Sequence, residues 1–293
     1  TIRLPFQSPL HPIHSPFCRN WSTPDFTEGL EYLRRNPALF DRRHLLSDHN
    51  GKQVWHIQLP PEYGGRNVVY KSCSTPKSGR YWFQLSQAAR EHRNYQLLYR
   101  LGIPAARILA IGESRRLFNL KSFFIVTEFI PGARDGRDFM CGGNLREDAA
   151  RRRQFWERNM PYLAQIHRRG FLHKAFHPRN ILWRENAAGE MEIFWIDMAR
   201  GRFRLPSQMK PGIAFDLYTL LKDLQLLPEE GEELLNCYLK HNPECGFTLP
   251  ELFGAMRNFR RRSSDPTPFC SMRRSNATAY RPRCASTPAA ATA

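Results

Sequence analysis

The sequence has no long apolar segment. Its longest apolar run lies around residues 123–126, whereas a helix that crosses a bilayer needs roughly 20 apolar residues. The first residues, TIRLPFQSPLHPIHSPF, contain prolines and histidines but no apolar core like that of a signal peptide. We therefore expect a cytoplasmic protein, which could also attach peripherally to the inner membrane.

Cysteine motifs are also missing. The chain has seven cysteines, an odd number, and no two of them form a CxxC pair. Disulfide frameworks and structural zinc sites are built from cysteines paired at characteristic spacings. The pattern therefore favours reduced thiols in a cytosolic protein.

Acidic residues are few relative to basic ones. The chain has 44 Lys plus Arg against 27 Asp plus Glu, which gives a net charge of +17. Such a charge attracts acidic partners: nucleic acid, anionic lipid head groups or phosphorylated sugars. We expect no nucleic-acid partner, because no recognised binding motif accompanies the charge. The arginines at 151–153 and between 257 and 283 are most simply solvated, and they are also candidate contacts with an anionic membrane surface.

The patterning predicts strands in the first half of the chain and helices in the second. Hydrophobic residues make up 41% and charged residues 24% of the 293 residues, which is typical of a globular protein. We expect strands at 54–59, 67–72, 106–111, 122–129, 181–183 and 192–197. We expect helices within 22–40, 84–101, 148–169 and 215–259. Residues 1–20 and 132–147 read as irregular, and the basic tail from residue 260 as disordered.

Local signals refine two of the helices. Thr23 or Asp25 is the predicted cap of the first helix, which should stop before Pro37. Pro161 lies inside the pattern of the 148–169 helix, so it predicts a kink or an interruption. The two strands at 54–59 and 67–72 should form a hairpin that places Lys71 on its second strand.

The segment at 171–200 carries the clearest chemistry. It reads FLHKAFHPRNILWRENAAGEMEIFWIDMAR. Phosphoryl transfer needs Mg²⁺ against the phosphates, and Mg²⁺ takes hard oxygen ligands from one or two protein groups. Asn180 on a loop and Asp197 at the end of a strand offer such oxygens. The spacing resembles the kinase catalytic loop H-x-D-x-x-x-x-N followed by the magnesium aspartate, with His173 at the His position.

Other parts of the kinase pattern occur in the expected order. Lys71 resembles the lysine that pairs with the α and β phosphates, and Glu91 in the next helix suits its ion-pair partner. The hinge that would bind adenine falls at Glu128, Phe129 and Ile130. Two further residues complete the resemblance: His177, which precedes Pro178 as in small-molecule kinases, and Asp216, which resembles the buried aspartate that steadies the catalytic loop.

Taken together, the passages YRLGIPAARILAIGE, TEFIPG, HKAFHPRNIL, FWIDMAR and FDLYTLL resemble the bacterial family that phosphorylates Kdo or heptose in the lipopolysaccharide core. The resemblance spans roughly residues 40–235. It implies an α+β, two-lobed protein-kinase-like fold with a small sheet-rich N-lobe and a mostly helical C-lobe. It also implies ATP and Mg²⁺ as cofactors, Asn180 and Asp197 as metal ligands, and an acidic lipid-linked sugar as substrate.

The chain departs from the family pattern at one catalytic position. Ala175 stands where the family has the aspartate that orients the acceptor hydroxyl and takes its proton, and a methyl group can do neither. A Gly-x-Gly-x-x-Gly phosphate loop is also absent before Lys71. Two alternatives therefore remain beside the sugar kinase. One is a pseudokinase that binds nucleotide or a partner without transfer, and the other is a kinase of another small hydroxyl compound or of a protein.

These patterns divide the chain into four regions. Each site residue taken alone could have a purely structural role; Asp216, for example, could cap a helix. Their joint order and spacing nevertheless agree with a kinase fold. We expect an N-terminal extension with a short helix at 1–40, an N-lobe at 41–130, a C-lobe at 131–259 and a tail at 260–293.

Overall fold

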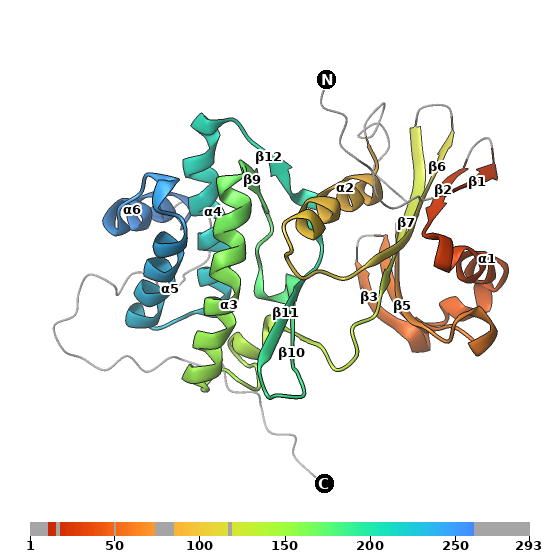
Figure 1. The fold of residues 1–293 in the computed structure, drawn as a ribbon, viewed down its shortest axis with the longest axis horizontal. Coiled ribbons are helices and arrows are strands. Elements are labelled where there is room, and N and C mark those ends of the chain that lie inside the picture. The colour runs from red at the N-terminus through yellow and green to blue at the C-terminus, as the bar shows by residue number, and fades with distance from the viewer. Residues whose placement is uncertain (1–10, 16–17, 50, 74–84, 117–118, 261–293) are drawn as a thin grey trace, which may run out of the picture.

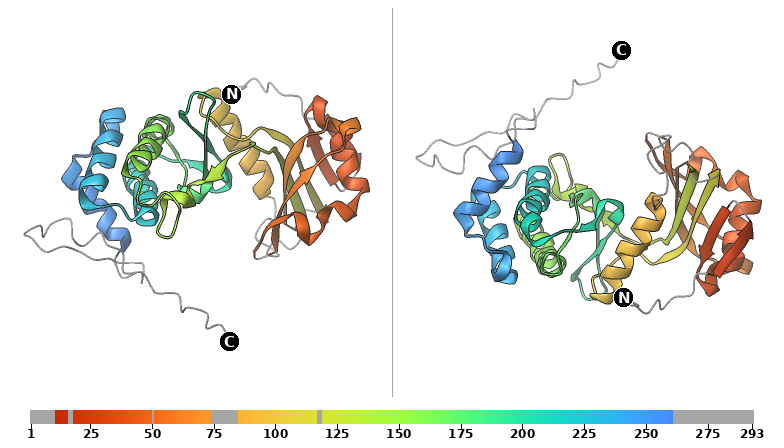
Figure 2. Two further views of the ribbon diagram at one scale, coloured as in Figure 1. Left: turned by 90° about the horizontal axis from the view of Figure 1, so that it is seen from below. Right: turned by 90° about the horizontal axis from the view of Figure 1, so that it is seen from above.

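The fold has a sheet-rich lobe and a helical lobe, placed side by side along the long axis (Figures 1 and 2). This computed structural model describes residues 11–15, 18–49, 51–73, 85–116 and 119–260. The expected tail lies outside these ranges, apart from its first residue, as do the first ten residues.

The sheet lobe is built on one antiparallel sheet, in which the spatial order of the strands differs from their order in the chain. Its seven strands follow the order β1-β2-β6-β7-β5-β4-β3. Their bounds are β1 His11–Ser15, β2 Cys18–Ser22, β3 Leu45–His49, β4 Lys52–Gln58, β5 Asn67–Cys73, β6 Ile108–Arg116 and β7 Asn119–Glu128. The predicted hairpin is confirmed, because β4 pairs with β5 and places Val54 opposite Lys71.

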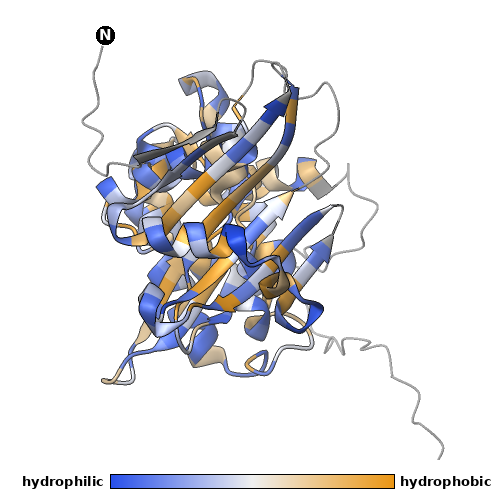
Figure 3. Cartoon of the chain, turned by 90° about the vertical axis from the view of Figure 1, so that its right-hand side faces the viewer, coloured by the Kyte–Doolittle hydropathy of each residue, from blue (hydrophilic) through white to orange (hydrophobic). Residues whose placement is uncertain are grey.

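Two helices cover the two faces of this sheet. α1 (Thr27–Arg35) packs Leu30 and Leu33 against an apolar cluster with Val126. α2 (Gln87–Arg100) packs on the other face, where Ile125 joins the larger core. Ile125 and Val126 are neighbours on β7, yet they point to opposite faces of the sheet, because side chains alternate along a strand. This strand is therefore buried on both faces. Figure 3, which looks onto this lobe, shows hydrophobic residues along the middle of the strands.

The second lobe is mostly helical. Its helices are α3 Ala149–Arg168, α4 Pro206–Leu224, α5 Pro228–His241 and α6 Leu249–Arg260. A small sheet of order β11-β10-β8 faces the first lobe. Its strands are β8 Arg134–Asp135, β10 Ile181–Glu185 and β11 Met191–Trp195, and a separate pair is formed by β9 Phe171–Leu172 and β12 Arg202–Phe203.

Hydrogen bonds and apolar packing join the two lobes in addition to the chain itself. The segment between α2 and β6 reaches the helical lobe, where the backbone N–H of Trp195 donates to the carbonyl of Pro104 (2.9 Å). The Gln165 side chain of α3 donates to the carbonyl of Leu101 (3.1 Å). One continuous apolar core therefore includes α2, the inner face of the large sheet and the helical lobe.

Several local predictions were wrong. Part of the first twenty residues forms β1 and β2, because β2 completes its hydrogen bonds on the edge strand β6. α1 itself begins after Phe26, because a short 3-10 turn at Pro24–Phe26 precedes it; Thr23 is the N-cap residue of that turn without a side-chain bond, and Asp25 instead pairs with Arg66 and Arg107. α3 runs through Pro161 as one element, so the interruption that was one of the two expected effects of this proline does not occur. The 132–147 region contains the short strand β8, and Asp216 lies in the middle of α4, not at its start.

No helix in the described ranges has the length and apolar character required to span a bilayer.

Candidate active site

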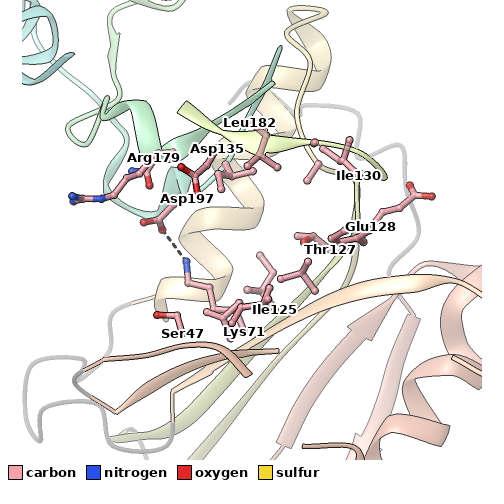
Figure 4. A pocket seen from close by; sticks show the side chains of 18 of the residues that line it. Ser47, Lys71, Ile125, Thr127, Glu128, Ile130, Asp135, Arg179, Leu182 and Asp197 are labelled. Carbon is pink, nitrogen blue, oxygen red and sulfur yellow. Dashed lines mark hydrogen bonds and ion pairs between the residues drawn. The ribbon is translucent and has the colours of Figure 1, made fainter. Parts of the chain in front are cut away.

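A cavity of about 950 Å³ lies between the lobes (Figure 4). Volumes up to roughly 1,000 Å³ are typical of pockets for small ligands. The cavity brings together seven of the residues singled out in the sequence: Lys71, Glu91, Glu128, Phe129, Ile130, Asn180 and Asp197. They come from the large sheet, α2, the connection between the lobes and the β10–β11 region.

Lys71 is the centre of the charged part of this cavity. Its Nζ lies 2.8 Å from Oδ1 of Asp197 and 3.3 Å from Oε2 of Glu91. The Glu91 side chain is only 4% exposed, whereas that of Asp197 is 43% exposed. Glu91 therefore positions the lysine from α2, and Asp197 remains accessible to a ligand in the cavity.

Burial and mutual attraction oppose each other in this cluster: burial raises the pKa of Glu91 overall, whereas the pKa values of Lys71 and Asp197 shift toward their charged forms. Burial disfavours the ammonium of Lys71, but the neighbouring carboxylates outweigh that effect and raise its pKa. Burial also acts to raise the pKa of Asp197, yet the charge and hydrogen bond of Lys71 lower it overall. A lysine held charged in this way is suited to meet an anionic group such as a phosphate.

Asp197 is held in an uncommon backbone conformation. It lies just after β11 with φ 57° and ψ 53°, in the left-handed region, which asparagine and aspartate tolerate better than most residues. The Asn94 side chain of α2 secures the following turn by donating to the carbonyls of Met198 (2.7 Å) and Gly201 (2.8 Å). α2 therefore fixes both the lysine partner Glu91 and the backbone that carries Asp197.

Asn180 and Asp197 are neighbours across the small sheet. The backbone N–H of Ile196 donates to the carbonyl of Asn180 (2.9 Å). The Nδ2 of Asn180 donates to the carbonyl of Ala175 (2.9 Å), so this bond leaves its Oδ1 as the remaining side-chain acceptor. One amide oxygen and one accessible carboxylate fit Mg²⁺, which uses one or two protein ligands and fills its other positions with phosphates and water. The described residues contain no cluster of three or more His, Cys, Asp or Glu suited to a metal held by protein alone.

The connection between the lobes offers one backbone donor to the cavity. The N–H groups of Glu128 and Phe129 donate to the carbonyls of Arg107 (2.8 Å) and Asn67 (3.0 Å). For Ile130, the residues with described positions provide no such acceptor, so its N–H can serve a ligand. The Glu128 carboxylate points away from Lys71 in Figure 4. Of the three residues predicted to contact adenine at the hinge, only Ile130 therefore keeps a backbone N–H for a ligand.

A buried hydrogen-bond network holds the segment 173–174, which the sequence matches to the kinase catalytic loop. Asp216 is fully buried, and its carboxylate accepts the backbone N–H groups of His173 and Lys174, each at 2.8 Å. The His173 ring is also fully buried, and among the described residues neither of its nitrogens has a hydrogen-bond partner. Burial lowers the pKa of His173 to about 4, so its neutral ring packs as an aromatic group against Phe176 and Trp195.

Ala175 and His177 do not line the cavity. Ala175 is 4% exposed. His177 is partly exposed, and its Nδ1 lies 2.7 Å from Oδ2 of Asp223 on α4. A histidine bound to a carboxylate through one nitrogen keeps its other nitrogen for a second partner.

Comparison with known proteins identifies the family. Residues 75–238, more than half of the chain, match the model of the lipopolysaccharide kinase (Kdo/WaaP) family. The chain belongs to this family. A solved structure described as WaaP in complex with acyl carrier protein has the same fold, with a TM-score of 0.59 and 19% identity, and the alignment covers 83% of this chain and 97% of that one. No curated protein matches the sequence.

Membership of the lipopolysaccharide kinase family confirms the predicted resemblance and the two-lobed kinase-like fold. The matched residues include Glu91, the hinge, the 171–200 segment and Asp216. Lys71 lies before the match, so its assignment rests on the geometry of its ion pairs.

Sequence reasoning missed three residues at the site. Lys52 on β4 lines the cavity. Its pKa is lowered, mainly by burial and also by the nearby charge of Lys71. Asp223, which pairs with His177, lies 46 positions further along the chain, and Asn94 bridges a separation of 104 and 107 positions. No short motif signals such distant partners.

Proposed function

We propose that this protein is an ATP-dependent kinase that phosphorylates a sugar hydroxyl, of Kdo or heptose, on a lipopolysaccharide precursor. The observation that carries the proposal is the placement of Lys71 between Glu91 and Asp197, in a cavity that Asn180 also lines. These are the charged and polar groups that a nucleotide triphosphate and its metal require.

The residues of the cavity that the sequence singled out receive these roles in the proposal. Lys71 binds the phosphates, with Glu91 holding it in place. The backbone near Ile130 binds the adenine. Asn180 and Asp197 would hold Mg²⁺, which when bound neutralises charge on the transferring phosphate. The leucine, isoleucine and valine side chains around the cavity exclude water from the nucleotide base.

The acceptor side lacks its usual carboxylate. Catalysis of phosphoryl transfer comes mainly from positioning and electrostatic stabilisation, so Ala175 does not by itself abolish transfer. His177 lies two residues after this position, where its backbone N–H donates to the carbonyl of Ala175 (2.8 Å), and Asp223 holds its ring by one nitrogen. We assign to His177 the contact with the acceptor hydroxyl or with the transferred phosphate. The net charge of +17 suits an acidic, lipid-linked acceptor.

One observation favours a second candidate, a pseudokinase that binds nucleotide without transfer. Ala175 is buried and neither it nor His177 lines the cavity, whereas the nucleotide-binding residues do. In that case the cavity would regulate a partner through nucleotide occupancy. A kinase of another small hydroxyl compound or of a protein would use the same nucleotide site.

Calorimetric titration of ATP with and without Mg²⁺ tests the nucleotide site. The parent chain should bind ATP only weakly without Mg²⁺, and Asp197→Ala should abolish the metal-dependent part of the binding. Asp41→Ala is the matched control, because Asp41 is remote from the cavity and its carboxylate bonds only Arg43 among the described residues. Equal ATP affinity of the parent and the Asp197 variant in Mg²⁺ would reject the assignment.

A transfer assay then separates the enzyme from the pseudokinase. Radiolabelled ATP is incubated with Kdo-bearing lipid A or with its heptose-extended form, and label in the lipid is measured. Transfer above that of the Asp197→Ala variant supports the kinase. ATP binding with no transfer to either acceptor supports the pseudokinase.

A further inference from the structure

The segment that follows Asp197 combines exposed apolar side chains with unbalanced positive charge. Residues 198–215 contain no acidic residue, while Arg200, Arg202, Arg204 and Lys210 lie within them. The stretch 202–208 is exposed, apart from a half-buried Arg204. Its two large apolar side chains, Phe203 and Leu205, are 57% and 66% exposed. We call residues 200–205 the docking segment.

The docking segment is fixed to the protein and lies next to the catalytic loop. β12 pairs with β9, which places Arg202 opposite Leu172, and the backbone N–H of Arg204 donates to the carbonyl of Gly170 (2.8 Å). The Phe203 ring meets the buried Phe171 edge-on at 5.2 Å. In Figure 1 β12 lies beside β9, at the side of the helical lobe that faces α2. The apolar side chains are therefore presented by an ordered backbone.

The positive charges of the docking segment are not neutralised by acidic neighbours. Within the described ranges, the ion pairs involve none of Arg200, Arg202 and Arg204, although other exposed arginines, such as Arg34 and Arg35, pair with glutamate. Burial, together with the charges of Arg204 and Arg90, lowers the pKa of Arg202. Repulsion between these like charges lowers the stability of the folded protein, and binding of an anionic partner offsets this repulsion.

We propose that the docking segment binds the surface of an anionic lipid bilayer, with Phe203 and Leu205 entering the interface and the three arginines contacting lipid phosphates. Exposed apolar side chains flanked by arginine are the composition of interfacial membrane-binding elements. The inference deepens the proposed function, on which it rests for its substrate, because the acceptor lipid would then be presented beside the catalytic loop. Vesicle binding is measured without ATP or acceptor, so its failure leaves the kinase assignment untouched.

Cosedimentation of the full chain with vesicles tests the proposal. The vesicles are phosphatidylcholine with or without phosphatidylglycerol, at two salt concentrations. The parent should bind the anionic vesicles more tightly and lose affinity as salt rises. Each basic residue near an anionic surface contributes about fivefold in affinity, so Arg202→Gln together with Arg204→Gln should weaken binding by roughly 25-fold.

A charge-matched control distinguishes this surface from the net charge of the chain. Arg34→Gln together with Arg35→Gln removes the same charge from α1 in the other lobe, and both arginines are exposed. This control should bind within about twofold to threefold of the parent, because its arginines already pair with Glu31. Equal losses in the two double variants, or no loss in the docking-segment variant, would overturn the proposal. The second result would assign binding to another basic region, such as the arginines after residue 260.

The apolar contribution is tested by a variant that should keep its fold. Leu205 precedes the first residue of α4 as its N-cap, and serine is a favourable N-cap residue, so Leu205→Ser should not destabilise the helix. It should weaken binding to anionic vesicles about tenfold or more, the effect of removing one large apolar side chain from the interface. Unchanged vesicle binding by this variant would show that no insertion occurs. Binding of an acidic protein, with no binding to vesicles, would also contradict the proposal.

Discussion

At the scale of single residues, Ala175 decides between the two candidate functions. It follows Lys174, which has a positive φ of 63°, and its carbonyl accepts the Asn180 side chain. The backbone on which the family's aspartate would stand is therefore held by the same contact that positions Asn180, one of the two proposed metal ligands. A retained scaffold of this kind can accept the missing carboxylate.

Ala175→Asp should raise phosphoryl transfer to the lipid acceptor by on the order of 10²–10⁴-fold, the usual contribution of general acid–base catalysis. The affinity for ATP should hardly change, because this position addresses the acceptor hydroxyl and not the nucleotide. The measurement is transfer of label from ATP, with parent and variant side by side.

The control for this prediction places a carboxylate elsewhere. Ala187→Asp adds the same group in the exposed turn between β10 and β11, where it should leave transfer unchanged. Background-level transfer by both the parent and the Ala175 variant, with ATP binding intact, would argue for the pseudokinase.

At the scale of secondary structure elements, α2 links the two halves of the proposed nucleotide site. Glu91 on this helix pairs with Lys71, and Asn94 binds the turn after Asp197. The two residues are three positions apart, so they lie on one face of the helix. A displacement of α2 would move Glu91, the partner of Lys71, together with the backbone of Asp197, the proposed metal ligand.

Asn94→Ala should therefore weaken binding of Mg-ATP and lower the free energy of unfolding. The substitution leaves the carbonyls of Met198 and Gly201 without their donor, which costs about 1–3 kcal/mol for each buried group left unsatisfied. Gln96→Ala is the control, because Gln96 lies on the same helix and bonds only His92. Denaturant unfolding and ATP titration measure the two effects. A variant that loses stability but binds Mg-ATP like the parent would separate Asn94 from the site.

Local patterns predicted the elements whose partners are near in sequence. The β4–β5 hairpin with Lys71 on its second strand, and the helix that carries Glu91, follow from residue periods and turn residues. The strands β1, β2 and β12 were not predicted, because their hydrogen bonds depend on distant edges. A two-residue strand such as β12 has no periodic signal of its own.

The same division applies to the candidate site. Asn180 and Asp197 could be placed together because the segment resembles the kinase motif, in which a short hairpin connects these two positions. Asp223 and Asn94 could not, since packing of α4 and α2 brings them in from separate parts of the chain. Asp216 was expected to steady the catalytic loop, and its hydrogen bonds to two loop N–H groups support that role.

At the scale of the whole molecule, one hydrophobic core extends across the boundary between the two lobes. The large apolar core contains Leu98 of α2 and Ile125 of the sheet together with residues of the helical lobe. A second, smaller cluster around α1, with Leu33, is confined to the sheet lobe. A shared core couples the stability of its parts, so we expect the lobes to unfold together.

Scanning calorimetry should accordingly show one transition, with equal calorimetric and van't Hoff enthalpies. Leu98→Ala empties part of the shared core, so it should lower the temperature of that single transition, at a cost of about 2–5 kcal/mol. Leu33→Ala is the matched comparison, because it creates a cavity of the same kind in the cluster confined to the sheet lobe. If the lobes were independent, both variants would split off an early transition of the sheet lobe while the helical lobe melted as in the parent. If the core couples them as we expect, Leu98→Ala moves the whole transition. Mg-ATP, whose proposed site lies between the lobes, should raise its temperature again.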